Sequence, residues 1–312
     1  MKVGQGDLLR EYGGLSPATT LDADSPLMPA GRRRASTARS THRLRALPHD
    51  QPVSDLITVT DPVIGFGDLL LPESTRRLFG EVHLEMRRED FLVHHGVSPR
   101  RRFLLVGPPG TGKSATAEAL ADELGRRLAT VNLSSLVSSL LGDTARNLAA
   151  IFAIASQENF VVLFDEFDAI GTERSEGTDH GELRRVVTTF LQQIDAFVGP
   201  SVLVAATNHP ALLDLAAWRR FDEVIPYNPP NVHDIRALLR LKLRSIPRER
   251  GLDVEAVAAA CRGLTHADVS AIVTNAYRRH LLFQPDSPLT TNELLVAANL
   301  ANKRAAAANA ST

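Results

Sequence analysis

One short run of sequence constrains the fold of this chain more than any other feature: F-L-L-V-G-P-P-G-T-G-K-S at residues 103–114. Its apolar residues predict a buried strand, its glycines a tight loop, and the residues from Lys113 onward the first turn of a helix. Glycines let the N–H groups of the loop turn toward one anion, and the start of the helix adds the positive end of its dipole. A strand, loop and helix in this order predict a binding site for a polyphosphate.

The residue types in this run also predict individual contacts. Lys113 is expected to reach the β- and γ-phosphates of a nucleotide, and the Ser114 hydroxyl to coordinate Mg²⁺. An ordinary glycine turn would explain the glycines but not the lysine and the hydroxyl that follow them. We therefore predict a site for ATP and Mg²⁺ with the contact residues Gly107, Pro108, Pro109, Gly110, Thr111, Gly112, Lys113, Ser114 and Ala115.

Strand and helix patterns alternate between residues 61 and 229. The predicted strands are residues 102–106, 129–132, 160–164, 202–206 and 223–225, and the predicted helices are residues 115–124, 144–156 and 183–197. Such alternation predicts an α/β fold, with a parallel sheet covered by helices on both faces. Ligands of these sheets bind beyond the carboxyl ends of the strands, which is where the glycine-rich loop falls.

The parts on either side of this region have other patterns. After Pro229 and Pro230, helical patterns at residues 232–245, 254–261, 266–282 and 291–301 predict a small all-helical domain over residues 230–302, with a tail at 303–312. Residues 1–60 are punctuated by Gly, Pro, Ser, Thr and Asp, and predict a disordered arm. Six arginines without an acid at residues 31–47 make a solvated tail the favoured interpretation over an arm that binds nucleic acid or a partner.

Composition limits the remaining possibilities. The net charge of −1 gives no global field for nucleic acid or for an anionic membrane. No apolar run approaches the roughly 20 residues of a membrane helix, so we expect no membrane span. Cys261 is the single cysteine in 312 residues, which excludes an internal disulfide and a cysteine metal cluster, and favours the cytoplasm.

Two further strands are predicted to deliver polar side chains to the same edge of the sheet. The run F-V-V-L-F-D-E ends in Asp165, which would bind Mg²⁺, and Glu166, which would polarise the attacking water. The run V-L-V-A-A-T-N-H delivers Asn208, whose amide could orient that water or contact the γ-phosphate. Asn-His-Pro is also an ordinary turn signal, so Asn208 alone would not decide between the two interpretations.

Arg219 and Arg220 follow Asn208 by about ten residues, in the run A-W-R-R-F-D. Arginine stabilises the charge of phosphoryl transfer when it is supplied from outside the site. Neither arginine has an obvious partner in its own subunit, although arginine pairs are common on protein surfaces.

The runs G-P-P-G-T-G-K-S, L-F-D-E-F-D-A-I, A-A-T-N and W-R-R-F-D, in this order, resemble the AAA family of ATPases over residues 62–300. They most resemble the branch that includes katanin, spastin and their bacterial relatives. This resemblance implies an ATP site between subunits of a hexameric ring, with Arg219 and Arg220 reaching the neighbour's nucleotide.

The resemblance also extends to the region around the nucleotide base. The run G-L-T-H-A-D-V at residues 263–269 is similar to the family's G-x-S-G-A-D lid segment, with His266 in place of a glycine. It implies that His266 packs the lid or contacts the edge of adenine. The run G-F-G-D-L at residues 65–69 lies where the family holds adenine through backbone groups, which implies contacts from Asp68 and Leu69.

One segment departs from the family pattern. Where the family places a lysine and an aromatic residue in the central pore of the ring, this chain has Ser139 and Leu140, followed by the usual glycine, Gly142. Leucine offers less apolar area than an aromatic ring and no π face, so we expect this loop to hold a threaded polypeptide less firmly. The favoured function is a ring ATPase that remodels a protein or a protein complex. A nucleic-acid ATPase such as a helicase loader is the alternative, and a scaffold without hydrolysis is disfavoured by the intact Lys113 and Glu166.

Overall fold

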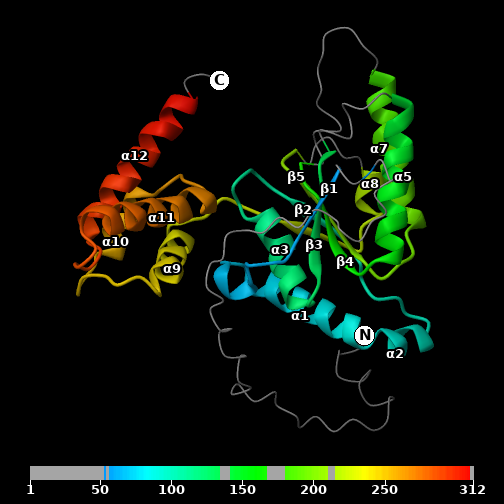
Figure 1. Cartoon of the computed structure of the whole chain (residues 1–312), viewed down its shortest axis with the longest axis horizontal. Helices are drawn as coiled ribbons and strands as arrows, with labels where there is room; N and C mark the ends of the chain where they lie inside the picture. Colours follow the sequence, from blue (N-terminus) through cyan, green and yellow to red (C-terminus); the bar gives the residue numbers. More distant parts are fainter. Residues whose placement is uncertain (1–52, 54–55, 134–140, 167–179, 210–214, 310–312) are drawn as a thin grey trace, which may run out of the picture. The chain divides into compact units, whose positions relative to one another are not determined.

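The computed structural model describes residues 53, 56–133, 141–166, 180–209 and 215–309 (Figure 1). These residues contain a six-stranded sheet in the order β1-β3-β4-β5-β2-β6. Its strands are β1 (Ile57–Thr60), β2 (Arg102–Val106), β3 (Arg127–Val131), β4 (Phe160–Phe164), β5 (Val202–Thr207) and β6 (Glu223–Pro226). All neighbouring pairs are parallel except β1 with β3. The predicted α/β fold is confirmed.

Helices cover both faces of this sheet, and Figure 1 shows α5 and α7 on the face opposite to α1 and α3. The helices around the sheet are α1 (Glu73–Arg87), α2 (Glu89–His94), α3 (Lys113–Glu123), α5 (Leu141–Gln157), α7 (His180–Ala196), the short α8 (Leu215–Trp218) and the 3-10 turn η1 (Phe66–Asp68). Every residue of β4 and β5 is buried, as expected for parallel strands covered on both sides.

Successive residues of a strand belong to different cores. On β2, Leu104 packs in the core that contains Phe152 and Phe190 of α5 and α7, whereas Phe103 and Leu105 pack in the core that contains Phe79 of α1. Side chains alternate across a strand with a period of two, so a continuous apolar run fills both cores at once. This explains why the apolar runs at residues 102–106 and 160–164 matched the observed strands.

The strand β1 corrects the prediction for the end of the arm. Residues 57–60 were assigned to a disordered segment, but they pair antiparallel with β3, with Ile57 opposite Val131. The run I-T-V-T is too short to establish a period by itself. Its pattern becomes clear in the structure, where Ile57 and Val59 are buried and Thr58 is exposed.

The chain after β6 forms four helices: α9 (Val232–Leu243), α10 (Val254–Ala260), α11 (His266–Phe283) and α12 (Thr291–Asn309). Asn231 begins α9 and Thr265 begins α11, each in a capping box with the aspartate three residues later. Helix α12 runs past the predicted end at residue 301, because alanines at 305–308 favour continued helix over a frayed tail. Within the described parts of the chain, no helix combines the length and apolarity needed to cross a membrane.

Candidate functional site

The glycine-rich segment after β2, residues 107–112, is here called the phosphate loop. Gly107 has φ 154°, and a Cβ added to it would lie 2.1 Å from the carbonyl oxygen of Tyr227. Gly110 has φ 74°, and a Cβ there would lie 2.6 Å from Oγ1 of Thr265. Both positions therefore require glycine. Any other residue would be strained at this positive φ, and its Cβ would clash with a neighbouring atom.

Lys113 begins α3 and is only 6% exposed. Its Nζ donates hydrogen bonds to the carbonyl oxygen of Gly107 at 2.6 Å, to that of Pro108 at 2.9 Å and to Oδ1 of Asn208 at 2.8 Å. An ammonium group has three donors, and these three acceptors satisfy them. The buried charge therefore lies inside the curve of the phosphate loop, at the end of β5.

Ser114 and Asp165 also meet at this edge of the sheet. The Ser114 hydroxyl donates a hydrogen bond of 2.6 Å to Oδ2 of Asp165, which directly follows β4. A hydroxyl and a carboxylate are the hard oxygen ligands that Mg²⁺ prefers, and Mg²⁺ usually takes its other ligands from phosphates and water. The described residues contain no group of three or more His, Cys, Asp or Glu side chains that could hold a metal ion. This donor set fits a metal that is bound together with a nucleotide.

Glu166 has an unusual backbone conformation. Its φ is 52°, in the left-handed region, and it is the one described residue other than glycine with positive φ. Its N–H donates to Oδ1 of Asp165 at 3.0 Å. Such a conformation costs about 1–3 kcal/mol and is found mainly where function requires it. The strained turn leaves the Glu166 side chain exposed beside the Ser114–Asp165 pair.

The two arginines after α8 have different surroundings. Nε of Arg220 lies 3.0 Å from Oδ2 of Asp195 on α7, so the expectation that neither arginine has a partner in its own subunit is wrong for Arg220. Arg219 is exposed, and within the part of the chain that the structure describes its side chain forms no hydrogen bond or ion pair. The structure therefore separates an arginine that is held within its subunit from one that faces outward.

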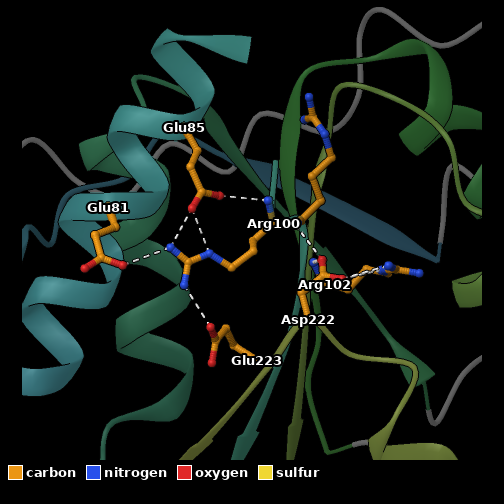
Figure 2. Close-up of polar contacts among 7 residues, drawn as sticks. Glu81, Glu85, Arg100, Arg102, Asp222 and Glu223 are labelled. Carbon is orange, nitrogen blue, oxygen red and sulfur yellow. Dashed lines mark hydrogen bonds and ion pairs between the residues drawn. The ribbon is translucent and has the colours of Figure 1, made fainter. Parts of the chain in front are cut away.

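Asp222, the last residue of the run A-W-R-R-F-D, has a structural role where strand β2 begins. Its Oδ2 accepts the N–H groups of Arg101 and Arg102 at 2.8 and 2.9 Å, and its Oδ1 lies 2.7 Å from Nη2 of Arg102. Figure 2 shows this pair beside the Arg100 guanidinium, which forms ion pairs with Glu81, Glu85 and Glu223. These contacts join α1, β2 and β6 and hold the chain that follows the two arginines.

The residues predicted to lie near adenine are partly engaged in local contacts. The Asp68 carboxylate accepts the N–H of Gly65 at 3.2 Å, and the carbonyl of Asp68 accepts Nζ of Lys242 at 2.9 Å. The carbonyl of Leu69 accepts Nη2 of Arg76 at 2.7 Å. The side chain of Asp68 thus caps η1, and neither carbonyl is without a donor.

His266 is the first residue of α11, and its Nδ1 is buried without a hydrogen-bond partner. Burial lowers the pKa of His266, so the ring favours the neutral form. The next residue, Ala267, donates its N–H to the carbonyl oxygen of Gly110 at 3.0 Å. This bond links the start of α11 directly to the phosphate loop.

Sequence reasoning missed two buried residues that contact the phosphate loop, Tyr227 at Gly107 and Thr116 at Gly112. The hydroxyl of Tyr227 donates a hydrogen bond to that of Thr116. No motif marks either residue, and the close approach of Tyr227 to Gly107 is visible only in the structure. Ser139 and Leu140, the predicted pore residues, lie outside the described residues, whereas Gly142 falls within α5.

Comparison with known proteins gives consistent matches. The family described as "ATPase family associated with various cellular activities (AAA)" matches residues 103–228. Uncharacterized AAA family ATPase y4kL of Sinorhizobium fredii is 36% identical over 236 residues, which are 76% of this chain and 71% of that protein. Protein SAV of Sulfolobus acidocaldarius is 31% identical over 263 residues, and this chain spans 34% of its length. The proteasome-activating nucleotidase of Pyrococcus horikoshii is 31% identical over 256 residues, and this chain spans 64% of its length.

Proposed function

Because the chain belongs to the AAA family of ATPases, we propose that it hydrolyses ATP with Mg²⁺, assembles as a ring and remodels a protein or a protein complex. One observation carries the proposal for hydrolysis. Two hydrogen bonds bring together residues from three separate parts of the sequence at one edge of the sheet: Lys113 donates to Asn208 at 2.8 Å, and its neighbour Ser114 donates to Asp165 at 2.6 Å.

Each residue has a role that suits its chemistry. Lys113 would bind the β- and γ-phosphates, and Ser114 with Asp165 would hold Mg²⁺. The metal, when bound, neutralises charge on the phosphate oxygens. Glu166 would orient the attacking water and take its proton, because it is a carboxylate at the same strand end as Asp165. Asn208 would fix the position of that water or of the γ-phosphate without adding charge.

Assembly and substrate are supported by the outward arginine and by the relatives. The exposed Arg219 could reach a neighbouring subunit's nucleotide. Head-to-tail contacts of this kind can close into a ring, which we propose to be a hexamer. Relatives named proteasome-activating nucleotidase and 26S proteasome regulatory subunit support protein substrates. Placement beside katanin and spastin, the division into domains at 61–229 and 230–302, and a cytoplasmic location stay predictions.

The alternative of a nucleic-acid ATPase rests on the basic arm at residues 31–47, which lies outside the described residues. Stimulation of ATP hydrolysis by DNA would favour it. No described contact points to nucleic acid, so protein remodelling remains the favoured function.

The proposal is tested by separating binding from hydrolysis. Lys113→Ala should abolish ATP binding, whereas Glu166→Gln should bind ATP and lose turnover, because lysine contacts the ground state and the glutamate acts on the water. Nucleotide titration and phosphate release measure the two effects. Lys303→Ala and Glu73→Gln, at exposed positions on α12 and α1, are matched controls that should behave as wild type. Equal turnover in wild type and Glu166→Gln would refute the assignment.

A further inference from the structure

Tyr227 directly follows β6 and lies against the start of the phosphate loop. It is 7% exposed. Its N–H donates to the carbonyl oxygen of Val106 at 2.6 Å, and its own carbonyl approaches Gly107 so closely that no Cβ fits there. The backbone of Tyr227 therefore sets the position at which the loop leaves β2.

The side chain of Tyr227 reaches the other end of the loop. Its hydroxyl donates a hydrogen bond of 2.8 Å to Oγ1 of Thr116, which is completely buried in α3. Oγ1 of Thr116 in turn donates to the carbonyl oxygen of Gly112 at 2.9 Å. Two hydroxyl groups thus form a chain of hydrogen bonds, here called the relay, from the end of β6 to Gly112, the last residue of the loop. Burial raises the pKa of Tyr227 to about 12, so the phenol keeps its proton at neutral pH and acts as a donor.

The relay ends on a peptide group that matters for anion binding. The carbonyl of Gly112 also accepts the N–H of Thr116 at 2.9 Å, so two hydrogen bonds fix its direction. In a trans peptide the N–H of the next residue points opposite to the carbonyl. Fixing the Gly112 carbonyl therefore fixes the N–H of Lys113 at the start of α3, where helix N–H groups bind phosphate.

We propose that Tyr227 is a positioning residue for the phosphate loop, which it clamps at Gly107 through its backbone and at Gly112 through Thr116. Its hydroxyl tightens the binding of the nucleotide polyphosphate by holding the loop in its binding conformation. The inference rests on the proposed binding of ATP. It goes further because it assigns a role to two buried residues that do not touch the phosphates.

The phosphate loop is also contacted by residues of the helical part. Tyr227 stands four residues before Asn231, which caps α9, and the start of α11 also contacts the loop through Thr265 and Ala267. The loop is thus held from the sheet side by Tyr227 and from the helical part by α11.

Tyr227→Phe is the decisive variant, because it removes one oxygen and keeps the ring that packs in the core. The affinity for a fluorescent ATP analogue and the steady-state KM should weaken by roughly three- to tenfold, the usual worth of one hydrogen bond. The kcat should change by less than twofold, because the hydroxyl acts on the loop in the ground state. A purely structural role would lower the thermal midpoint and the amount of active protein without this KM-against-kcat split.

Substitutions at Thr116 test the relay without changing Tyr227. Thr116→Val should weaken the binding of the ATP analogue by at least as much as Tyr227→Phe does. Thr116→Ser should bind it as tightly as wild type, because serine keeps the hydroxyl. The double variant Tyr227→Phe/Thr116→Val should bind no more weakly than Thr116→Val alone, since both changes break the same relay.

Helix α11 supplies matched controls. Thr274 on α11 donates to the carbonyl four residues earlier at 3.0 Å, as Thr116 does, but it is exposed. Tyr277 is half-buried on the same helix. Thr274→Val and Tyr277→Phe should bind the analogue as wild type does.

The outcomes distinguish this inference from the proposed function. If Tyr227→Phe and Thr116→Val bind as tightly as Tyr277→Phe while Lys113→Ala does not bind, Tyr227 is a packing residue and only the inference fails. If the wild-type chain itself does not bind the analogue, the proposed ATP site is wrong and the inference falls with it.

Discussion

Oδ1 of Asn208 accepts a hydrogen bond of 2.8 Å from Nζ of Lys113, although the two residues are 95 positions apart. They meet because β5 and β2 are neighbouring parallel strands, with Val106 opposite Thr207. The residues that follow these strands therefore lie side by side at the carboxyl edge of the sheet. An amide in this position holds the lysine by a hydrogen bond and, unlike a carboxylate, does not neutralise its charge.

We first predict that the charge of residue 208 controls this lysine. Asn208→Asp would convert the contact into a buried ion pair, which should hold Lys113 away from phosphate and raise the Kd for ATP. Asn208→Ala should retain binding and lower kcat by about a hundredfold, the usual effect of removing one preorganised polar group. Nucleotide titration and phosphate release measure both effects.

Asn275 on α11 provides the control for this prediction. Its Oδ1 also accepts a hydrogen bond from a cation, Nη1 of Arg278 at 2.8 Å, but the pair is exposed. Asn275→Asp should leave ATP binding and turnover unchanged. Wild-type kinetics in both Asn208 variants would show that the amide has no part in the reaction.

The second prediction concerns the close approach of Tyr227 to Gly107. Gly107→Ala places a methyl group 2.1 Å from a backbone oxygen, which cannot move as the end of a flexible side chain can. The substitution should destabilise the fold by about 1–3 kcal/mol. In α1, Gly80→Ala meets no atom within 4 Å and should stabilise the helix by about 0.5–1 kcal/mol. Urea unfolding of the two variants should therefore give shifts of opposite sign, and equal shifts would contradict the prediction.

The third prediction separates the two arginines. Arg219 faces outward, so Arg219→Ala should retain ATP binding and lower turnover by roughly a thousandfold, as expected for an arginine supplied in trans. Mixing Arg219→Ala subunits with Lys113→Ala subunits should restore part of the activity. Some interfaces would then combine an intact phosphate loop with an intact arginine. A monomer with full activity at high dilution would exclude this arrangement.

Arg220 should depend on Asp195 instead. Arg220→Ala should lower the turnover of ATP, and if the ion pair of 3.0 Å positions Arg220, Asp195→Asn should reproduce a large part of that loss. The pair is partly exposed, so its effect on stability should be small, and thermal midpoints should stay close to that of wild type. Full activity of Asp195→Asn beside an inactive Arg220→Ala would show that the arginine acts without this partner.

The sequence predicted those parts of the molecule that depend on neighbours along the chain. Strands β2 and β4 were located correctly because each contains a continuous apolar run, of four residues in β2 and five in β4, that is buried on both faces. The meeting of Lys113, Asp165 and Asn208 at one edge followed from the order of parallel strands. Their assigned chemical roles stay predictions.

The features that were missed depend on partners far away in the sequence. Residues 57–60 are recognisable as a strand only when paired with β3, about 70 residues later. The contact of Arg220 with Asp195 and that of Tyr227 with Thr116 join residues on different elements, so no local pattern marks them. Helix α12 was predicted too short because its last turns are rich in alanine, which carries no amphipathic signal.

A buried histidine in the helical part has acceptors on both sides of its ring. His280 on α11 is 2% exposed, and its Nδ1 lies 2.9 Å from Oε1 of Glu293 on α12. Its Nε2 lies 2.7 Å from the carbonyl oxygen of Ser287. Only the imidazolium form has a proton on each nitrogen, so this geometry favours the charged ring. The hydrogen bond to Glu293 raises the pKa of His280 above its ordinary value.

The final prediction is that this histidine makes the stability of the helical part depend on pH. The folded-state pKa of His280 lies above the value of about 6.5 expected in the unfolded chain. The stabilisation is therefore complete below that pH and is lost as the pH rises through the folded-state pKa. Thermal midpoints of wild type should fall over this range, whereas His280→Gln should lack this part of the decline. His83→Gln alters a partly exposed pair with Glu123 on α1 and α3 and should keep this decline. Identical slopes for wild type and His280→Gln would disprove the role of the ring.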